Sequence, residues 1–187
     1  MRIISGKFKG KKILEPTDLN TRPLKDLTKE SIFNIIKHSN KFEIKFENSE
    51  ILDLFSGTGS FGIECISRGA KFVTFVENYK SILPILKKNL SSLNSALNYL
   101  IIEKDIFNNF NFKEFNKQFD IIFLDPPYKE KELNYVLSSL IAEKILKQDG
   151  IIILHRHKKQ IDSLPFQIKV LEEKKYGISK ILFCNIS

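Results

Sequence analysis

The stretch Glu50-Ile-Leu-Asp53-Leu-Phe-Ser-Gly57-Thr-Gly59-Ser-Phe-Gly62 decides the fold. Its apolar run over 51–55 predicts a buried strand, and the glycines after that strand match the pattern G-x-G-x-x-G. We expect a helix from Phe61 to Arg68, directly after the glycines. A glycine-rich turn between a strand and a helix lets the backbone approach a nucleotide-like ligand closely. A plain tight turn is the alternative, but loop, spacing and strand context together favour a cofactor site.

Predicted strands and helices alternate on both sides of this stretch. The other apolar strand segments cover residues 71–77, 98–104, 119–124 and 151–154. Helical spacing covers residues 24–40, 81–93 and 131–147. Two further β-prone runs, 167–172 and 179–186, are joined around Tyr176-Gly177 and predict an antiparallel hairpin. The order predicts an α/β fold with a mostly parallel sheet covered by helices on both faces.

Composition limits the classes of function. Lys and Arg number 30 against 22 Asp and Glu in 187 residues, which gives a net charge of +8. Such an excess suggests a polyanionic partner, although a lysine-rich composition also arises from genome base composition. No apolar run is long enough to cross a bilayer, and no signal peptide is visible. The two cysteines have no metal-binding or redox spacing, so we expect a cytoplasmic protein without a metal.

The N-terminal residues carry basic charge before the first acid, Glu15. Two β-prone pieces, 2–5 and 11–14, predict a small basic hairpin suited to phosphate contacts. A solvated terminus is the alternative for the hairpin, and a lone surface arginine is the alternative for Arg22. We therefore divide the chain into an arm and linker, 1–22, and a main domain, 23–187. The candidate RNA-binding residues are Arg2, Lys7, Lys9, Lys11 and Arg22.

Acidic residues lie at or near the carboxyl ends of the first three predicted strands of the sheet. Asp53 lies inside the first strand, Glu77 ends the second, and Asp105 follows the third. A pyrophosphate cofactor gains nothing from these carboxylates, whereas a cationic cofactor with ribose hydroxyls does. S-adenosylmethionine fits this pattern better than a nicotinamide dinucleotide, which stays an alternative. The candidate cofactor-binding residues are Asp53, Ser56, Gly57, Gly59, Glu77 and Asp105.

The turn Asp125-Pro126-Pro127-Tyr128 follows the apolar strand 119–124. The prolines fix φ and remove two backbone donors, which predicts a stiff, extended turn. The Asp125 carboxylate and the Pro126 carbonyl can accept from an amino group, and Tyr128 can stack on the ring that bears it. These three residues are therefore the catalytic candidates. An acidic strand end followed by a simple proline turn is the alternative.

Basic residues also follow the strand at 151–154, in the run His155-Arg156-His157-Lys158-Lys159. We expect a solvated basic face here, with nucleic-acid contact as the second possibility. Two alternate histidines without a third ligand do not predict a metal site.

The motifs in this order resemble those of class I S-adenosylmethionine-dependent methyltransferases that modify exocyclic amino groups. Over nearly its full length the chain resembles the RsmD family, bacterial enzymes that methylate a guanine N2 in 16S ribosomal RNA. The resemblance implies a Rossmann-like, seven-stranded sheet and an RNA or assembling small-subunit partner. Besides the site motifs, it rests on Arg2-Ile-Ile-Ser-Gly-Lys-Phe-Lys-Gly, Thr21-Arg22-Pro23, Lys29-Glu30-Ser31-Ile32-Phe33-Asn34, Ser67-Arg68-Gly69-Ala70 and Lys175-Tyr176-Gly177.

The chain departs from the family pattern at three places. Leu24 replaces a common threonine. In the next turn the family usually carries an arginine, whereas this chain has only Lys29. His155 follows the fifth strand, where a glutamate is frequent in the family. Three alternatives stay open: an adenine-N6 methyltransferase on DNA or RNA, a methyltransferase of a protein glutamine, and a non-catalytic RNA-binding assembly protein. We expect a monomer in each case.

Overall fold

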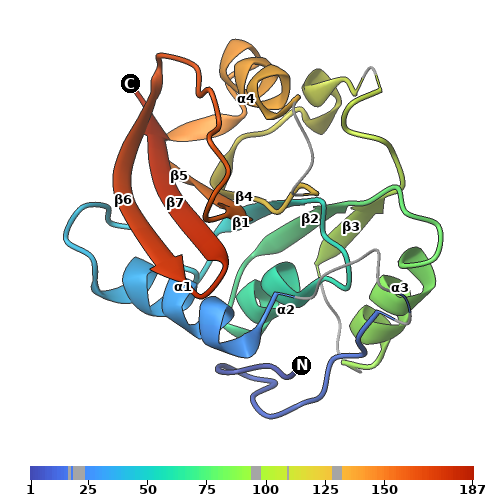
Figure 1. Ribbon diagram of the computed structural model, residues 1–187. Coiled ribbons are helices and arrows are strands. Elements are labelled where there is room, and N and C mark those ends of the chain that lie inside the picture. The colour runs from blue at the N-terminus through green and yellow to red at the C-terminus, as the bar shows by residue number, and fades with distance from the viewer. Residues whose placement is uncertain (17, 19–23, 94–97, 109, 128–131) are drawn as a thin grey trace.

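The computed structural model describes residues 1–16, 18, 24–93, 98–108, 110–127 and 132–187. Seven strands form one sheet in the order β3-β2-β1-β4-β5-β7-β6 (Figure 1). The first five strands pair in parallel, and β7 pairs antiparallel to both β5 and β6. The mostly parallel sheet with a closing hairpin is therefore confirmed. The strands are β1 Glu50–Leu54, β2 Phe72–Val76, β3 Tyr99–Ile102, β4 Phe119–Leu124, β5 Leu146–His157, β6 Ile168–Tyr176 and β7 Ser179–Ile186.

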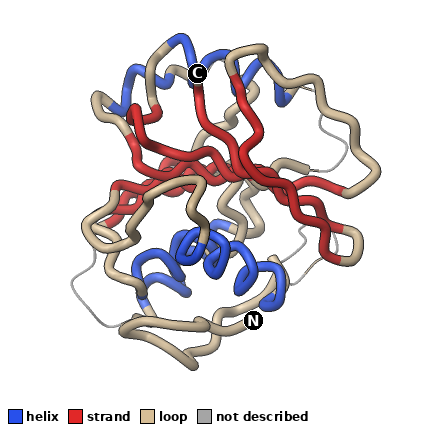
Figure 2. Tube along the Cα trace, turned by 90° about the vertical axis from the view of Figure 1, so that its left-hand side faces the viewer, coloured by secondary structure: helices blue, strands red, loops and turns tan. Residues whose placement is uncertain are grey.

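Helices cover both faces of this sheet (Figures 1 and 2). Neighbouring residues of a strand point to opposite faces, so Ile51 belongs to one buried cluster and Leu52 to the other. The first cluster includes side chains of α1, α2 and α3, and the second includes those of α4 and the 3₁₀ helix η1. The helices are α1 Asp26–His38, α2 Ser60–Ser67, α3 Leu83–Ser91, η1 Phe112–Phe115 and α4 Leu133–Ala142.

The strand register brings the ends of five parallel strands into one row. Leu54 of β1 pairs with Val76 of β2 and with Leu124 of β4. Val76 in turn pairs with Ile102 of β3, and Leu124 pairs with Leu154 of β5. The residues that follow these five positions therefore meet along one edge of the sheet, where open α/β sheets bind their ligands.

The N-terminal segment lies against α2. Its two pieces pair at a single antiparallel bridge, Arg2 with Lys12, where the sequence predicted a hairpin of two short strands. The carboxylate of Glu64 in α2 accepts hydrogen bonds from the amides of Ile4 (2.7 Å) and Ser5 (2.9 Å). The segment is thus held by its backbone to the main fold.

A buried lysine completes this attachment. Lys29 of α1 donates to the carbonyl of Arg2 (2.7 Å), and its Nζ lies 3.8 Å from the Glu64 carboxylate. Arg68 approaches the same carboxylate at 2.9 Å from Nε. Burial lowers the pKa of Lys29, although the charges of Glu64 and Asp26 oppose that effect.

Two element boundaries differ from the prediction. The helix predicted over 131–147 ends at Ala142, because the chain turns at Lys144, whose φ is 51°. The strand predicted over 151–154 extends from Leu146 to His157. This longer β5 lies between β4 and β7, so its last residues are inside the sheet and not in a surface loop. Among the helices of the described part of the chain, none has the length and apolar character needed to cross a membrane.

Candidate active site

The glycine loop after β1 makes a sharp turn. Phe55, Gly57 and Gly59 have positive φ values of 61°, 55° and 80°. Ser56 ties the loop to the sheet, because its hydroxyl donates to the carbonyls of Asp53 (2.8 Å) and Val76 (3.0 Å). The loop is thereby fixed across the ends of β1 and β2.

Glu77 follows β2 and receives three backbone hydrogen bonds. Its Oε2 accepts from the amide of Gly57 (2.8 Å), and its Oε1 accepts from those of Asn78 (2.9 Å) and Tyr79 (2.8 Å). A carboxylate has about four acceptor positions. Glu77 therefore braces the loop and keeps capacity for one more donor.

Asp53 lies under the loop and is 1% exposed. Its Oδ2 accepts from the amide of Gly62 at 2.9 Å. Burial raises the pKa of Asp53 well above its usual value; the Gly62 bond opposes this, and the charges of Asp125 and Glu77 add to it. A Cβ at Gly62 would lie 2.3 Å from the Phe75 ring, so only glycine lets α2 approach this closely.

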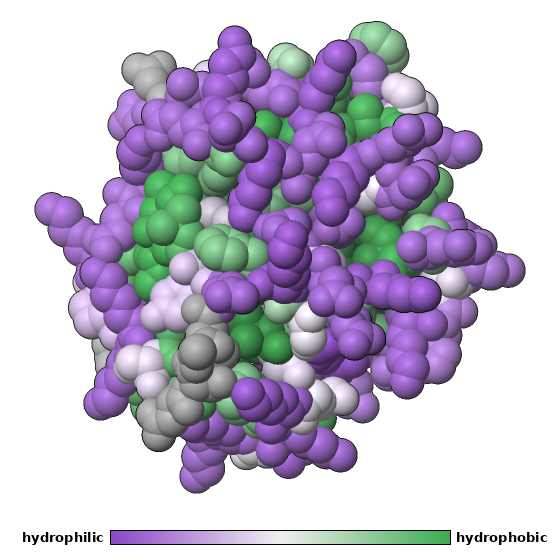
Figure 3. All heavy atoms as spheres, turned by 180° about the vertical axis from the view of Figure 1, so that it is seen from behind, coloured by the Kyte–Doolittle hydropathy of each residue, from purple (hydrophilic) through white to green (hydrophobic). Residues whose placement is uncertain are grey.

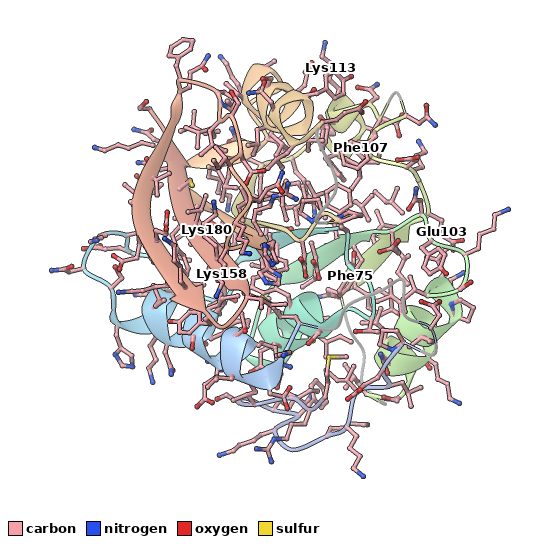
Figure 4. The ribbon with its side chains drawn as sticks, viewed as in Figure 1. Phe75, Glu103, Phe107, Lys113, Lys158 and Lys180 are labelled. Atoms are coloured by element: carbon pink, nitrogen blue, oxygen red, sulfur yellow. The ribbon has the colours of Figure 1, made fainter. Side chains whose placement is uncertain are left out.

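Asp105 lies three residues after the end of β3. Its Oδ1 accepts from the amide of Phe107 (3.0 Å), which closes a tight turn. The ring of Phe107 packs against that of Phe55 from the glycine loop, with 5.2 Å between centroids. This half-exposed aromatic pair was not a candidate from the sequence; Figure 4 shows the position of Phe107.

The Asp125 turn begins where β4 ends, next to the glycine loop. The Asp125 amide donates to the carbonyl of Leu54, the last residue of β1 (3.3 Å). The Asp125 side chain is 20% exposed, and its Oδ1 lies 2.8 Å from Nδ1 of His155. Its Oδ2 has no hydrogen-bond partner in the described part of the chain. Pro126 is buried, and the predicted stacking residue Tyr128 lies outside the described residues.

The expectation of a solvated face at His155 is wrong. His155 is 6% exposed, and its ring spans from Asp125 of the turn to Ser179 of β7, with 2.9 Å from Nε2 to the Ser179 hydroxyl. Burial lowers the pKa of His155, but the charge of Asp125 and its hydrogen bond outweigh burial and Arg156, so the pKa is raised. His155 was therefore not among the site residues predicted from the sequence.

Arg156 is likewise buried, with 0% of the residue exposed. Its guanidinium pairs with Asp162 (2.8 Å) and donates to the carbonyl of Pro127 (3.2 Å). Consecutive residues of β5 therefore hold the side chain and the backbone of the same proline turn.

The predicted RNA-binding residues that the structure describes have different contacts. Lys7 and Lys9 are exposed, and Arg2 lies 3.9 Å from Asp26. Lys11 donates to the carbonyl of Ser92 at the end of α3. Arg22 lies outside the described residues.

Two other lysines lie beside the site and were not on the candidate list. The Lys158 amide donates to the carbonyl of Ile178 (2.8 Å), so Lys158 lies next to Lys180 on the neighbouring strand (Figure 4). Lys180 donates to the carbonyl of Gln160 (2.8 Å). Both are close along the chain to His155 and Ser179, so basic charge flanks the Asp125 turn.

The edge of the sheet at which the five parallel strands end favours a cationic ligand that carries hydroxyl groups. Asp53, Glu77 and Asp125 come from three neighbouring strands, and the charges of the latter two both act on Asp53. A bound cation would offset this repulsion, and Glu77 has room for a hydroxyl donor. These carboxylates therefore fit a sulfonium nucleoside better than they fit a pyrophosphate.

Comparison with known proteins gives a consistent result. A family model described as Conserved hypothetical protein 95 matches residues 1–185. A ribosomal RNA small subunit methyltransferase D of Buchnera aphidicola is 37% identical over 87% of this chain and 81% of its own. A solved Haemophilus influenzae structure is 32% identical, with a TM-score of 0.73, and covers 100% of this chain and 98% of that one. A solved structure complexed with SAH has a TM-score of 0.63 at 18% identity and covers 84% of this chain and 49% of that one, which shows a shared fold.

Proposed function

This chain belongs to the Conserved hypothetical protein 95 family and is a methyltransferase, and from that premise we propose that it methylates ribosomal RNA. The methyl group comes from S-adenosylmethionine, and the acceptor is the exocyclic N2 amino group of a guanine in small-subunit RNA. The observation that carries the proposal is the 3.3 Å bond from Asp125 to Leu54, which joins an amine-accepting turn to the strand that bears the glycine loop.

The cofactor site consists of the loop and the acids around it. S-adenosylmethionine supplies a methyl group that is already activated for transfer. Gly57 and Gly59 let the backbone approach the cofactor, Ser56 fixes the loop, and Glu77 accepts from a ribose hydroxyl. Asp53 and Asp105 complete an acidic surround that favours the cationic cofactor. The fold shared with a protein complexed with SAH supports this assignment.

The acceptor site is the proline turn. An exocyclic amine on a base is planar and delocalises its lone pair into the ring, so it is a poor nucleophile. It becomes a better nucleophile when hydrogen bonds favour its pyramidal form. Asp125 accepts one N–H, the Pro126 carbonyl accepts the other, and Tyr128 stacks on the base. When the amine takes the methyl group that a bound cofactor would supply, it would become cationic, and the Asp125 carboxylate would stabilise that charge. The proton then passes to Asp125 or to water.

The substrate assignment rests on the named relative and on charge. A target base must leave its stack or lie in an unpaired loop to reach Asp125. The net charge of +8 favours an RNA partner. We assign Arg2, Lys7, Lys9, Lys11 and Arg22 to phosphate contacts, residues 1–22 to an arm and residues 23–187 to the methyltransferase domain. The enzyme acts as a cytoplasmic monomer on ribosomal RNA or the assembling small subunit.

A transfer assay with identification of the product nucleoside tests this function. Purified protein is incubated with methyl-tritiated S-adenosylmethionine and either free small-subunit RNA or small subunits from cells that lack the gene. We expect the label in N2-methylguanosine after nuclease digestion. Label in N6-methyladenosine would support the adenine alternative, and no label in either RNA substrate would contradict the proposal.

Replacement of the acceptor carboxylate separates binding from transfer. We expect Asp125→Ala to abolish methyl transfer, because the amine loses the acceptor that aligns it, while calorimetry shows nearly unchanged affinity for S-adenosylmethionine. Asp149→Ala is the matched control, since Asp149 is an exposed aspartate near the opposite end of β5. Asp125→Ala protein with full activity would show that the acceptor site is wrongly placed.

A further inference from the structure

We propose that His155 is a positioning residue that orients the Asp125 carboxylate toward the acceptor amine, with Ser179 as its own anchor. The inference rests on the proposed function, because it adds a residue to the same acceptor site. It assigns a role to a buried side chain that replaces the glutamate frequent in the family pattern.

The ring of His155 is fixed at both nitrogen atoms. Nδ1 lies 2.8 Å from Oδ1 of Asp125, and Nε2 lies 2.9 Å from the hydroxyl of Ser179. Its strand is central, since β5 pairs with β4 on one side and with β7 on the other. A buried ring held between two neighbouring strands cannot turn without losing a hydrogen bond.

The contact selects which carboxylate oxygen faces the substrate. An ionised carboxylate only accepts, so Nδ1–H of His155 donates to Oδ1 of Asp125. Oδ2 has no partner in the described part of the chain and is the oxygen left for the amine. Arg156 adds to this from the next position, because its bond to the Pro127 carbonyl (3.2 Å) holds the backbone of the turn.

The Ser179 hydroxyl preserves the geometry in both protonation states of the ring. When His155 is neutral, the hydroxyl donates to Nε2; when His155 is protonated, the hydroxyl accepts from Nε2–H. The orientation of Asp125 therefore stays the same across the titration of His155. Only the charge of the Asp125–His155 pair changes, from about −1 to zero.

That charge change affects the rate in a defined direction. Methyl transfer makes the amine cationic, so a pair with net negative charge stabilises the transition state better than a neutral pair. Among the described residues, the groups that face His155 include Asp125 from the turn after β4, the hydroxyl of Ser179 from β7 and Arg156 from its own strand. Because the pKa of His155 is raised above 6.5, the rate should rise with pH on the alkaline side of that value.

Two substitutions at this position test the role. We expect His155→Ala to lower kcat by up to about 10²-fold, as for a misplaced catalytic group, with little change in KM for S-adenosylmethionine. His155→Asn places an amide N–H near the former Nδ1–H, so it should recover most of kcat while the pH dependence disappears. His157→Asn is the matched control on the same strand, two residues away, and should keep both the rate and the pH profile of the wild type.

Two outcomes would overturn the inference and leave the proposed function intact. One is a His155→Ala enzyme with wild-type kcat, and the other is a His155→Asn enzyme with the wild-type pH profile. Circular dichroism shows whether each variant folds; if His155→Ala does not, the pH profile of His155→Asn decides.

A second readout does not depend on activity. In NMR titrations of the imidazole signals, Asp125→Asn should lower the pKa of His155, because it removes the charge that raises it. An unchanged His155 titration would contradict the pairing even if the enzyme is active. Wild-type protein that shows the pairing but transfers no methyl to RNA at any pH would contradict the proposed function instead.

Discussion

Asp53 is the residue at which stability and function oppose each other. Its carboxylate is buried, and its pKa is raised by burial first and then by the charges of Asp125 and Glu77. A carboxyl group with a raised pKa in the folded state keeps its proton when the unfolded state has lost it. The folded state therefore loses stability as pH rises above the unfolded pKa of 3.8, until the native group has also ionised. A bound cationic cofactor would reverse part of this loss.

Asp53→Asn should therefore separate the two effects. The asparagine oxygen can still accept from the Gly62 amide, but the buried charge is gone. We expect the free energy of unfolding at pH 7 to increase relative to the wild type, with a smaller difference near pH 4, as measured by urea denaturation. We also expect weaker binding of S-adenosylmethionine by calorimetry. A variant that is less stable at pH 7, or that binds the cofactor as tightly as the wild type, would contradict this account.

Single residues also show where prediction from sequence succeeds and where it stops. The placement of Ser56, Gly57, Glu77 and Asp125 at one edge of the sheet could be predicted, because each follows an apolar strand and strand register brings strand ends together. His155 was missed because it lies in a basic run, which is typical of a surface. One signal was present: a strand followed by a hairpin in the same sheet can be central, and the residues of a central strand are buried on both faces.

At the level of elements, the N-terminal segment differs most from its prediction. The sequence predicted a hairpin of two short strands, but the two pieces pair at one bridge and the backbone amides of the first piece bind Glu64 of α2. The hydrophobic positions Ile3 and Ile13 correctly predicted that the segment packs, and both are buried. Its partner could not be predicted, because Glu64 has no local pattern that marks it as a buried acceptor 60 residues away.

Glu64→Gln should loosen this attachment. The Gln side chain keeps one acceptor oxygen but presents its NH2 group to one of the amides of Ile4 and Ser5. It also leaves the charge of Lys29 without its buried partner. Breaking a buried ion pair from one side costs about 3–5 kcal/mol, so we expect a large loss in the free energy of unfolding. Hydrogen exchange at Ile4 and Ser5 should become faster by local opening, while exchange in β4 should become faster only to the extent that global stability is lost.

A double variant is the control for that prediction. Glu64→Gln combined with Lys29→Met removes both charges, so it should be more stable than Glu64→Gln alone. Equal stability of the single and the double variant would show that the unpaired charge of Lys29 is not what destabilises Glu64→Gln.

For the molecule as a whole, charge is the main property relevant to RNA. The excess of +8 is spread over both ends of the chain, and hydrophilic side chains cover most of the face seen in Figure 3. The lysines beside the Asp125 turn, Lys158 and Lys180, come from a different part of the fold than Lys7 and Lys9. The salt dependence of the affinity for RNA, measured in lysine variants, can therefore show which of these lysines contact RNA.

We expect the affinity for RNA to fall steeply with salt, whereas the affinity for S-adenosylmethionine changes little. Each phosphate contact contributes a slope of about −0.7 to −0.9 in a plot of log affinity against log salt. Lys158→Ala and Lys7→Ala should each reduce the magnitude of the slope by about 1 if the lysine binds a phosphate. Lys71→Ala, before β2 at the opposite edge, should not change it. Salt-independent binding to RNA would contradict an electrostatic interface.

The order of synthesis gives the contact between His155 and Ser179 a further meaning. The glycine loop and the Asp125 turn are complete once β4 has been made, but Ser179 opens β7, the strand of this sheet that is translated last. Because chains fold as they emerge from the N-terminal end, a nascent chain can form the loop before His155 has its anchor. In the proposed function, the acceptor site is therefore completed only after β7 has been translated.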